Sequence, residues 1–135
     1  MTMHIMIRIE HIAMWVDDID LVCQFYARYF SAGVGKRYQN EAKGFTSQFL
    51  MFSSGARIEV MSTTTLSPVK HDAGAHRMGL THFAVSLGSE QAVNSLVSEL
   101  KQAGVPVIDG PRRTGDGYYE AVILDPEGNR VELMA

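Results

Sequence analysis

The sequence has little of three things that would narrow its function directly: cysteine, net charge and long apolar runs. A single cysteine, Cys23, excludes an intrachain disulfide. A formal net charge of −3 gives no electrostatic reason to expect binding to nucleic acid or to an anionic membrane. No apolar run approaches the roughly 20 residues that cross a bilayer, and the start of the chain lacks the pattern of a secretory signal. We therefore expect a cytoplasmic protein without nucleic-acid or membrane partners.

What the sequence does have is an internal repeat. The string Arg57–Met61 (RIEVM) is a near copy of Arg130–Met134 (RVELM), and Ile9–Ala13 (IEHIA) resembles Leu80–Ala84 (LTHFA). A chain of 135 residues fits one domain, and each half is so small that it would have difficulty burying a core by itself. The repeat therefore predicts one domain, residues 1–135, built from two modules. Its predicted parts are a first module at about 5–62, a polar linker at about 63–78 and a second module at about 79–135.

Periodicity predicts the same order of elements, β-α-β-β-β, in both modules, and hence an α+β fold class. In the first module the strands are expected at Ile7–Trp15, Gly35–Gln39, Phe45–Phe52 and Ala56–Met61, and the helix at Ile19–Phe30. In the second module the strands are expected at Leu80–Leu87, Val105–Ile108, Tyr118–Leu124 and Arg130–Met134, and the helix at Glu90–Ala103. The strand at 105–108 is expected to end at a turn formed by Gly110-Pro111.

Each half offers one histidine near its start and one glutamate near its end. His11 and His82 take equivalent positions in the first strands, and Glu59 and Glu132 take equivalent positions in the last strands. Histidine and glutamate are costly to bury without a partner, so their repetition favours a shared function over a structural role for each residue, which is the alternative. Two imidazoles and two carboxylates suit Zn, Ni, Co, Mn or Fe(II). We therefore predict that these four residues form a divalent metal site.

The motifs around these residues resemble a known family. The strings EHIA at Glu10–Ala13, LTHFA at Leu80–Ala84 and LDPEGNRVEL at Leu124–Leu133 resemble the vicinal oxygen chelate superfamily. That superfamily includes glyoxalase I, methylmalonyl-CoA epimerase, extradiol dioxygenases and the fosfomycin- and bleomycin-resistance proteins. The resemblance covers essentially the whole chain. It implies a glyoxalase-like fold, in which paired βαβββ modules form two half-barrels around a metal-binding cleft, and it implies a homodimer.

Within that superfamily the chain is most similar to the glyoxalase I branch. The resemblance implies one divalent metal ion held by His11, Glu59, His82 and Glu132, with Ni, Co or Zn expected first and Fe or Mn as alternatives. Dioxygenases use two histidines and one carboxylate, so the retained Glu59 favours a lyase or isomerase. By resemblance to lactoylglutathione lyase, Glu132 or Glu59 is the catalytic base that moves a proton next to a metal-bound carbonyl. The two glutamates are chemically similar, and we favour Glu132.

The sequence departs from glyoxalase I where that enzyme binds glutathione. Bacterial glyoxalase I has an arginine four residues after the first histidine and an asparagine four residues after the first glutamate, where this chain has Trp15 and Thr63. The chain therefore lacks these two residues of the glutathione-binding site, and its sequence does not identify the small-molecule substrate. The candidate substrate-binding residues, each with core packing or a solvated surface as its structural alternative, are Trp15, Phe49, Met51, Arg113 and Tyr119.

Three functions are consistent with these observations. The first is a metal-dependent lyase or isomerase of the glyoxalase type. The second is a metal-dependent dioxygenase or an antibiotic-modifying enzyme that uses Fe or Mn. The third is a metal-free protein that sequesters a planar ligand, as the bleomycin-resistance proteins do. The two retained carboxylates argue against the third, because a sequestering cleft has no use for them.

Overall fold

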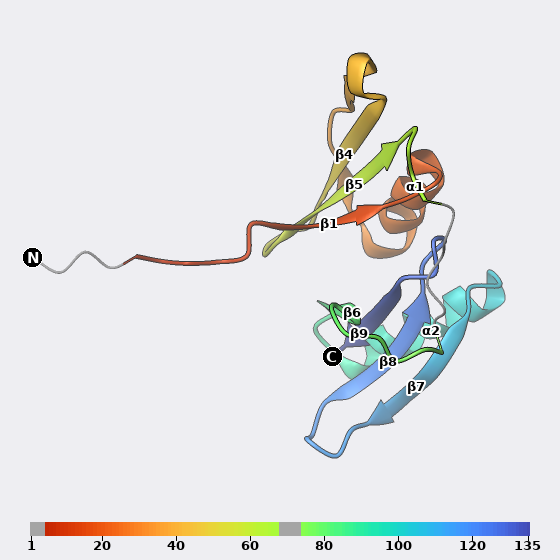
Figure 1. Cartoon of the computed structure of the whole chain (residues 1–135). Helices are drawn as coiled ribbons and strands as arrows, with labels where there is room; N and C mark the ends of the chain where they lie inside the picture. Colours follow the sequence, from red (N-terminus) through yellow and green to blue (C-terminus); the bar gives the residue numbers. More distant parts are fainter. Residues whose placement is uncertain (1–4, 68–73) are drawn as a thin grey trace, which may run out of the picture. The chain divides into compact units, whose positions relative to one another are not determined.

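The computed structural model describes residues 5–67 and 74–135 of the chain. The chain divides into two compact units, Met1–Ser67 and Pro68–Ala135. The boundary falls inside the predicted linker, part of which (68–73) lies outside the described residues. Each unit consists of one sheet with one long helix on one face (Figure 1). The α+β architecture of two βαβββ modules is therefore confirmed.

The first unit has the strand order β1-β5-β4-β2, and β3 also pairs with β4. Its elements are β1 (His11–Trp15), α1 (Ile19–Phe30), β2 (Gly33–Val34), β3 (Tyr38–Asn40), the 3-10 helix η1 (Glu41–Lys43), β4 (Phe45–Met51) and β5 (Arg57–Thr63). The first and last strands, β1 and β5, run parallel at one side of the sheet.

The second unit repeats this topology with the order β6-β9-β8-β7. Its elements are β6 (His82–Ser86), α2 (Glu90–Gln102), β7 (Val107–Arg113), β8 (Tyr119–Leu124) and β9 (Arg130–Met134). Again the first and last strands, β6 and β9, are parallel neighbours. The internal repeat seen in the sequence is thus a repeat of topology.

Capped amphipathic helices form one side of each core. The Asp18 side chain accepts a hydrogen bond from the Leu21 backbone N–H and so starts α1, while the Ser89 hydroxyl accepts one from Ala92 N–H and starts α2. The apolar stripes of the helices are buried, and so are the alternate residues of the strands beneath them. In the first unit the buried set includes Val22, Cys23, Tyr26, Leu50, Ile58 and Val60, and in the second Val93, Val97, Leu100, Ile123, Val131 and Leu133.

Two strands of the first unit differ from the prediction. The sequence pattern begins at Ile7, but the strand β1 begins at His11, because the ladder with β5 starts at the His11–Arg57 pair. Residues 5–10 run ahead of it as an extended segment (Figure 1). The expected strand at 35–39 is an interrupted edge strand, β2 and β3. Between these two pieces, the Gln48 side-chain amide donates to the Gly35 carbonyl oxygen at 2.8 Å, so a side chain supplies part of the pairing there.

The prediction of a turn at Gly110-Pro111 is wrong. β7 continues through this dipeptide to Arg113, and the Gly110-Pro111 peptide bond is cis. The β7–β8 register shifts between Val107 and Arg112, which makes this stretch a bulge in an edge strand. Edge strands and bulges are where a sheet accepts proline, and the sequence pattern did not distinguish such a bulge from a turn.

Within residues 5–67 and 74–135, no helix is long and apolar enough to span a membrane.

Candidate functional site: two histidine–glutamate pairs

Alternation along the last strand of each unit separates a buried face from a polar face. In β5, Ile58 and Val60 are buried beneath α1, whereas Glu59 points to the opposite face. In β9, Val131 and Leu133 are buried in the same way, and Glu132 takes the opposite face. We call this helix-free side of each sheet the ligand face.

Strand register brings each histidine to the same face as its glutamate. In the parallel ladder of the first unit, His11 pairs with Arg57 and Ala13 pairs with Glu59. The second unit has the identical register, with His82 opposite Arg130 and Ala84 opposite Glu132. Paired residues of neighbouring strands share a face, so each ligand face carries one imidazole and one carboxylate.

The pair of the first unit is close but has no direct hydrogen bond. His11 Nε2 lies 3.7 Å from Glu59 Oε1. The His11 side chain is 39% exposed and that of Glu59 is 19% exposed. The pair is therefore partly withdrawn from water and still open on one side, as a ligand-binding group must be.

A second carboxylate, that of Glu10, lies behind His11. Its Oε1 is 3.5 Å from His11 Nδ1 and accepts a hydrogen bond from Arg57 Nε at 2.8 Å. The hydrogen bond from Arg57 is the main reason that the pKa of Glu10 is lowered from its usual value. The Arg57 guanidinium also lies over the Phe49 ring, 4.0 Å from its centroid. Arg57 thus holds the negatively charged carboxylate of Glu10 next to Nδ1 of His11.

The pair of the second unit is in direct contact. His82 Nε2 meets Glu132 Oε2, and the Glu132 side chain is only 14% exposed. Thr81 takes the position before His82 that Glu10 takes before His11. We call each histidine–glutamate pair with its neighbours a half-site. The two half-sites have the same kinds of ligand and the same strand register, but they differ in the residue that precedes the histidine.

A further acid, Glu120 on β8, lies beside Glu132. A hydrogen bond between the two carboxyl groups, together with burial, raises the pKa of Glu120 to about 7. Arg112, its partner across the β7–β8 ladder, lowers that pKa to a smaller extent. In the first unit the equivalent position is Ser47, because Ser47 pairs with Met61 as Glu120 pairs with Met134. The second half-site therefore carries an additional carboxyl group.

The donor atoms of each half-site fit a divalent cation. Each half offers an imidazole nitrogen and a carboxylate oxygen that approach each other on one face, and both donor types bind Zn, Ni, Co, Fe or Mn. In the part of the chain that the structure describes, no group of three or more His, Cys, Asp or Glu is arranged to hold a metal ion. Each unit by itself thus supplies two of the four predicted ligands.

Comparison with known families agrees with the topology and the motifs. A family model described as "Glyoxalase/Bleomycin resistance protein/Dioxygenase superfamily" matches residues 8–133. The chain belongs to this superfamily. It is the vicinal oxygen chelate superfamily that the sequence motifs resemble. A curated relative, the uncharacterized protein YqjT of Bacillus subtilis (strain 168), is 26% identical over 132 residues, which are 93% of this chain and 97% of YqjT.

Solved structures of the superfamily share the fold. The trypanothione-dependent glyoxalase I of Leishmania major matches with a TM-score of 0.74 and 23% identity, over 96% of this chain and 86% of that one. A glyoxalase/bleomycin resistance protein/dioxygenase domain from Frankia sp. EAN1pec matches with a TM-score of 0.80 and 19% identity, over 96% of this chain and 91% of that one. The glyoxalase-like fold is therefore confirmed.

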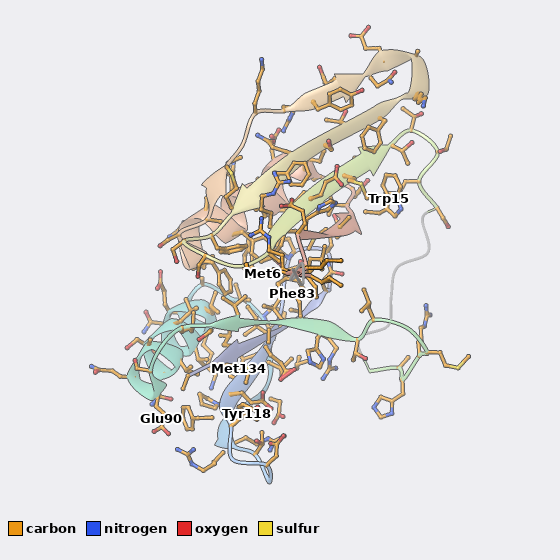
Figure 2. All side chains as sticks on the ribbon, turned by 90° about the vertical axis from the view of Figure 1, so that its left-hand side faces the viewer. Met6, Trp15, Phe83, Glu90, Tyr118 and Met134 are labelled. Atoms are coloured by element: carbon orange, nitrogen blue, oxygen red, sulfur yellow. The ribbon has the colours of Figure 1, made fainter. Side chains whose placement is uncertain are left out.

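Three of the five predicted substrate-binding residues lie on the ligand face of the first unit. Phe49 is the ladder partner of Glu59, and its ring meets the His11 ring edge-on with 5.4 Å between centroids. Met51, two residues further along β4, shares that face and is 40% exposed. Trp15 lies at the carboxyl end of β1, is 51% exposed, and is labelled in Figure 2. Phe49 therefore borders the His11–Glu59 pair, and Met51 and Trp15 extend the apolar surface of the same face.

The other two, Arg113 and Tyr119, lie on the opposite, helix-covered side of their sheet. Arg113 forms an ion pair with Glu90, the first residue of α2. The Tyr119 hydroxyl donates a hydrogen bond to Asn94 Oδ1, also on α2, at 2.5 Å. The structure does not bring these two residues to Glu132, and we leave them out of the proposed site.

Sequence reasoning missed two acids of the site, Glu10 and Glu120. A signal for each was present. Glu10 directly precedes the predicted ligand His11, and Glu120 falls two residues before Val122, the ladder partner of Glu132. Period-two alternation therefore places Glu120 on the ligand face once the β8–β9 register is known.

Proposed function

We propose that the protein is a metal-dependent lyase or isomerase of the glyoxalase type, which moves a proton next to a substrate carbonyl. The observation that supports this most is the repeated pair of ligands. His11 with Glu59 and His82 with Glu132 occupy the same register on the same face of two equivalent sheets. Neither pair serves the hydrophobic core, which lies on the other face of each sheet.

In this proposal the four side chains hold one divalent cation, with Ni, Co or Zn expected. When bound, the cation would supply a positive charge that polarises a carbonyl and acidifies the adjacent C–H group. His11 and His82 would bind through Nε2, the nitrogen that faces the glutamate in each half. Glu59 and Glu132 would contribute carboxylate oxygens and balance the charge of the cation.

Glu132 is the proposed catalytic base. It would take the proton from the substrate carbon and return it to the neighbouring carbon. The two proposed ligand glutamates have different surroundings. Glu132 has the carboxyl group of Glu120 as a neighbour, and the equivalent position in the first unit is Ser47. An adjacent acid that shares a hydrogen bond with Glu132 offers a place to hold a proton close to the reacting carboxylate, which supports Glu132 over Glu59.

The test is turnover of thiol adducts of 2-oxoaldehydes by protein loaded with Ni, Co or Zn. Glu132→Gln keeps the shape of the side chain but cannot accept the proton, so kcat should fall by about 10²–10⁴-fold while the thermal midpoint stays close to that of the wild type. Glu99→Gln, an exposed change on α2, is the control and should retain full activity. Undiminished turnover by Glu132→Gln would contradict the assignment of the base.

A second candidate function is sequestration of a planar ligand, and the exposed aromatic surface favours it. Trp15 is half exposed and meets the Phe45 ring edge-on, with 6.1 Å between centroids. Trp15 is also the only tryptophan of the chain, so its fluorescence reports directly on this surface. Tight, saturable quenching by a planar ligand in the presence of a chelator would favour sequestration, whereas a requirement for metal would favour the enzyme.

The homodimer implied by the resemblance remains part of the proposal. Light scattering behind size-exclusion chromatography measures it directly. A mass of about twice the 14.9 kDa of one chain is expected, and a single-chain mass at working concentration would contradict it.

A further inference from the structure

We infer that Glu10 is a positioning residue for His11, and that it makes the first half-site the better organised of the two for binding a cation. This inference rests on the proposed function, because it concerns how a metal ligand is held. It concerns a residue outside the four ligands and predicts an inequality between two halves that share the same topology.

The contacts of Glu10 carry the inference. Its carboxylate is held by Arg57, which donates from both Nε and Nη2 to Oε1. The backbones of the two residues are also connected, because the Arg57 N–H donates a hydrogen bond to the Glu10 carbonyl oxygen at 3.0 Å. Arg57 is in turn fixed over the ring of Phe49. The carboxylate beside His11 is therefore anchored by a neighbouring strand.

The position of this carboxylate determines which nitrogen of His11 is free. With Glu10 Oε1 3.5 Å from Nδ1, the negative charge of the carboxylate favours the tautomer of His11 that carries its proton on Nδ1. The lone pair on Nε2 then faces Glu59 Oε1 at 3.7 Å. Two electron-rich atoms that face each other without a proton between them are stabilised by a cation. Histidine ligands of metals commonly donate their other N–H to such a carboxylate.

The second half of the chain provides an internal comparison. Thr81 takes the place of Glu10, although the strand register is the same and Arg130 is equivalent to Arg57. A neutral threonine cannot fix the His82 tautomer as a carboxylate does. The alternative explanation of Glu10 is a surface ion pair with Arg57 alone, and such a pair contributes little to stability and nothing to His11.

The experiment compares wild type, Glu10→Ala, Glu10→Gln and the control Arg8→Ala, whose guanidinium lies 3.9 Å from the other Glu10 oxygen. Titration of the metal-free proteins with Co²⁺ alone should give about 10–100-fold weaker binding for Glu10→Ala. Glu10→Gln should be intermediate, because its amide oxygen still accepts the Nδ1 proton, and Arg8→Ala should match the wild type. Adding Thr81→Glu to Glu10→Ala should restore part of the affinity.

A second readout does not depend on metal. Nitrogen-15 spectra of the metal-free protein should show the Nδ1–H form of His11 in the wild type and Glu10→Gln, and a shift away from it in Glu10→Ala. If the wild type binds Co²⁺ and Glu10→Ala matches it in affinity and in tautomer, this inference is overturned and the proposed function stands. If the wild type itself takes up no Co²⁺, the proposed function fails, and this inference fails with it.

Discussion

Replacing Glu120 by glutamine tests the electrostatics of the second half-site. The carboxyl group of Glu120 shares a hydrogen bond with that of Glu132. This hydrogen bond is the main reason that the pKa of Glu120 is raised from 4.5 to about 7. Glutamine keeps the hydrogen-bonding shape but cannot ionise. The variant therefore isolates the cost of placing a second negative charge beside Glu132.

The sign of the effect follows from the direction of the shift. The folded protein holds the Glu120 proton more tightly than the unfolded chain does, so the protonated carboxyl contributes stability that is fully present below about pH 4.5. That stability is lost as the pH rises through about 7. The full shift would correspond to at most about 3 kcal/mol. Because Glu120 is partly exposed, solvent screening reduces the expected effect to about 1 kcal/mol.

The assay is denaturant unfolding of metal-free protein at about pH 5 and about pH 8. Relative to the wild type, Glu120→Gln should gain about 1 kcal/mol in free energy of unfolding between the two conditions. Glu99→Gln on the exposed face of α2 is the control, and its difference from the wild type should not change with pH. A stability difference for Glu120→Gln that is the same at both pH values would refute the proposed coupling of Glu120 to Glu132.

Two further predictions concern the framework around the site. Gly110 and Gly128 both have positive φ, 76° and 85°, so alanine at either costs about 1–2 kcal/mol. At Gly110 the new Cβ would also come within 2.5 Å of the Glu120 backbone oxygen, whereas nothing lies within 4 Å at Gly128. Thermal unfolding should therefore show Gly110→Ala to be less stable than Gly128→Ala by a further ~1–3 kcal/mol, and equal losses would contradict this. Tyr119→Phe removes the hydrogen bond to Asn94 and should cost about 1 kcal/mol by the same measurement without changing the affinity for Co²⁺, since Tyr119 lies on the other face from Glu132.

Much of the fold could be predicted from local signals. The helix at Ile19–Phe30 and the strand at Arg130–Met134 were predicted with the bounds that the structure has. Each combines a clear period with a clear boundary residue, such as the Asp18 cap. The repeat predicted the common topology, because two homologous sequences must satisfy the same pairing of first and last strands.

The remaining features depend on contacts between distant residues. Where β1 begins is decided by where β5 begins, and the continuation of β7 through Gly110-Pro111 is decided by its pairing with β8. The same holds for the site. The internal repeat identified the four proposed ligands, but Glu10 and Glu120 could be recognised only when the structure placed them beside His11 and Glu132.

The central proposal is that both histidine–glutamate pairs contribute ligands to one cation. Elemental analysis of protein incubated with Ni, Co or Zn and then desalted tests it most directly, with His11→Ala and His82→Ala measured in parallel. The account predicts about one metal ion per chain in the wild type and a clear loss of metal in both variants, although the two residues belong to different units. No metal in the wild type, or undiminished metal in either variant, would contradict the claim.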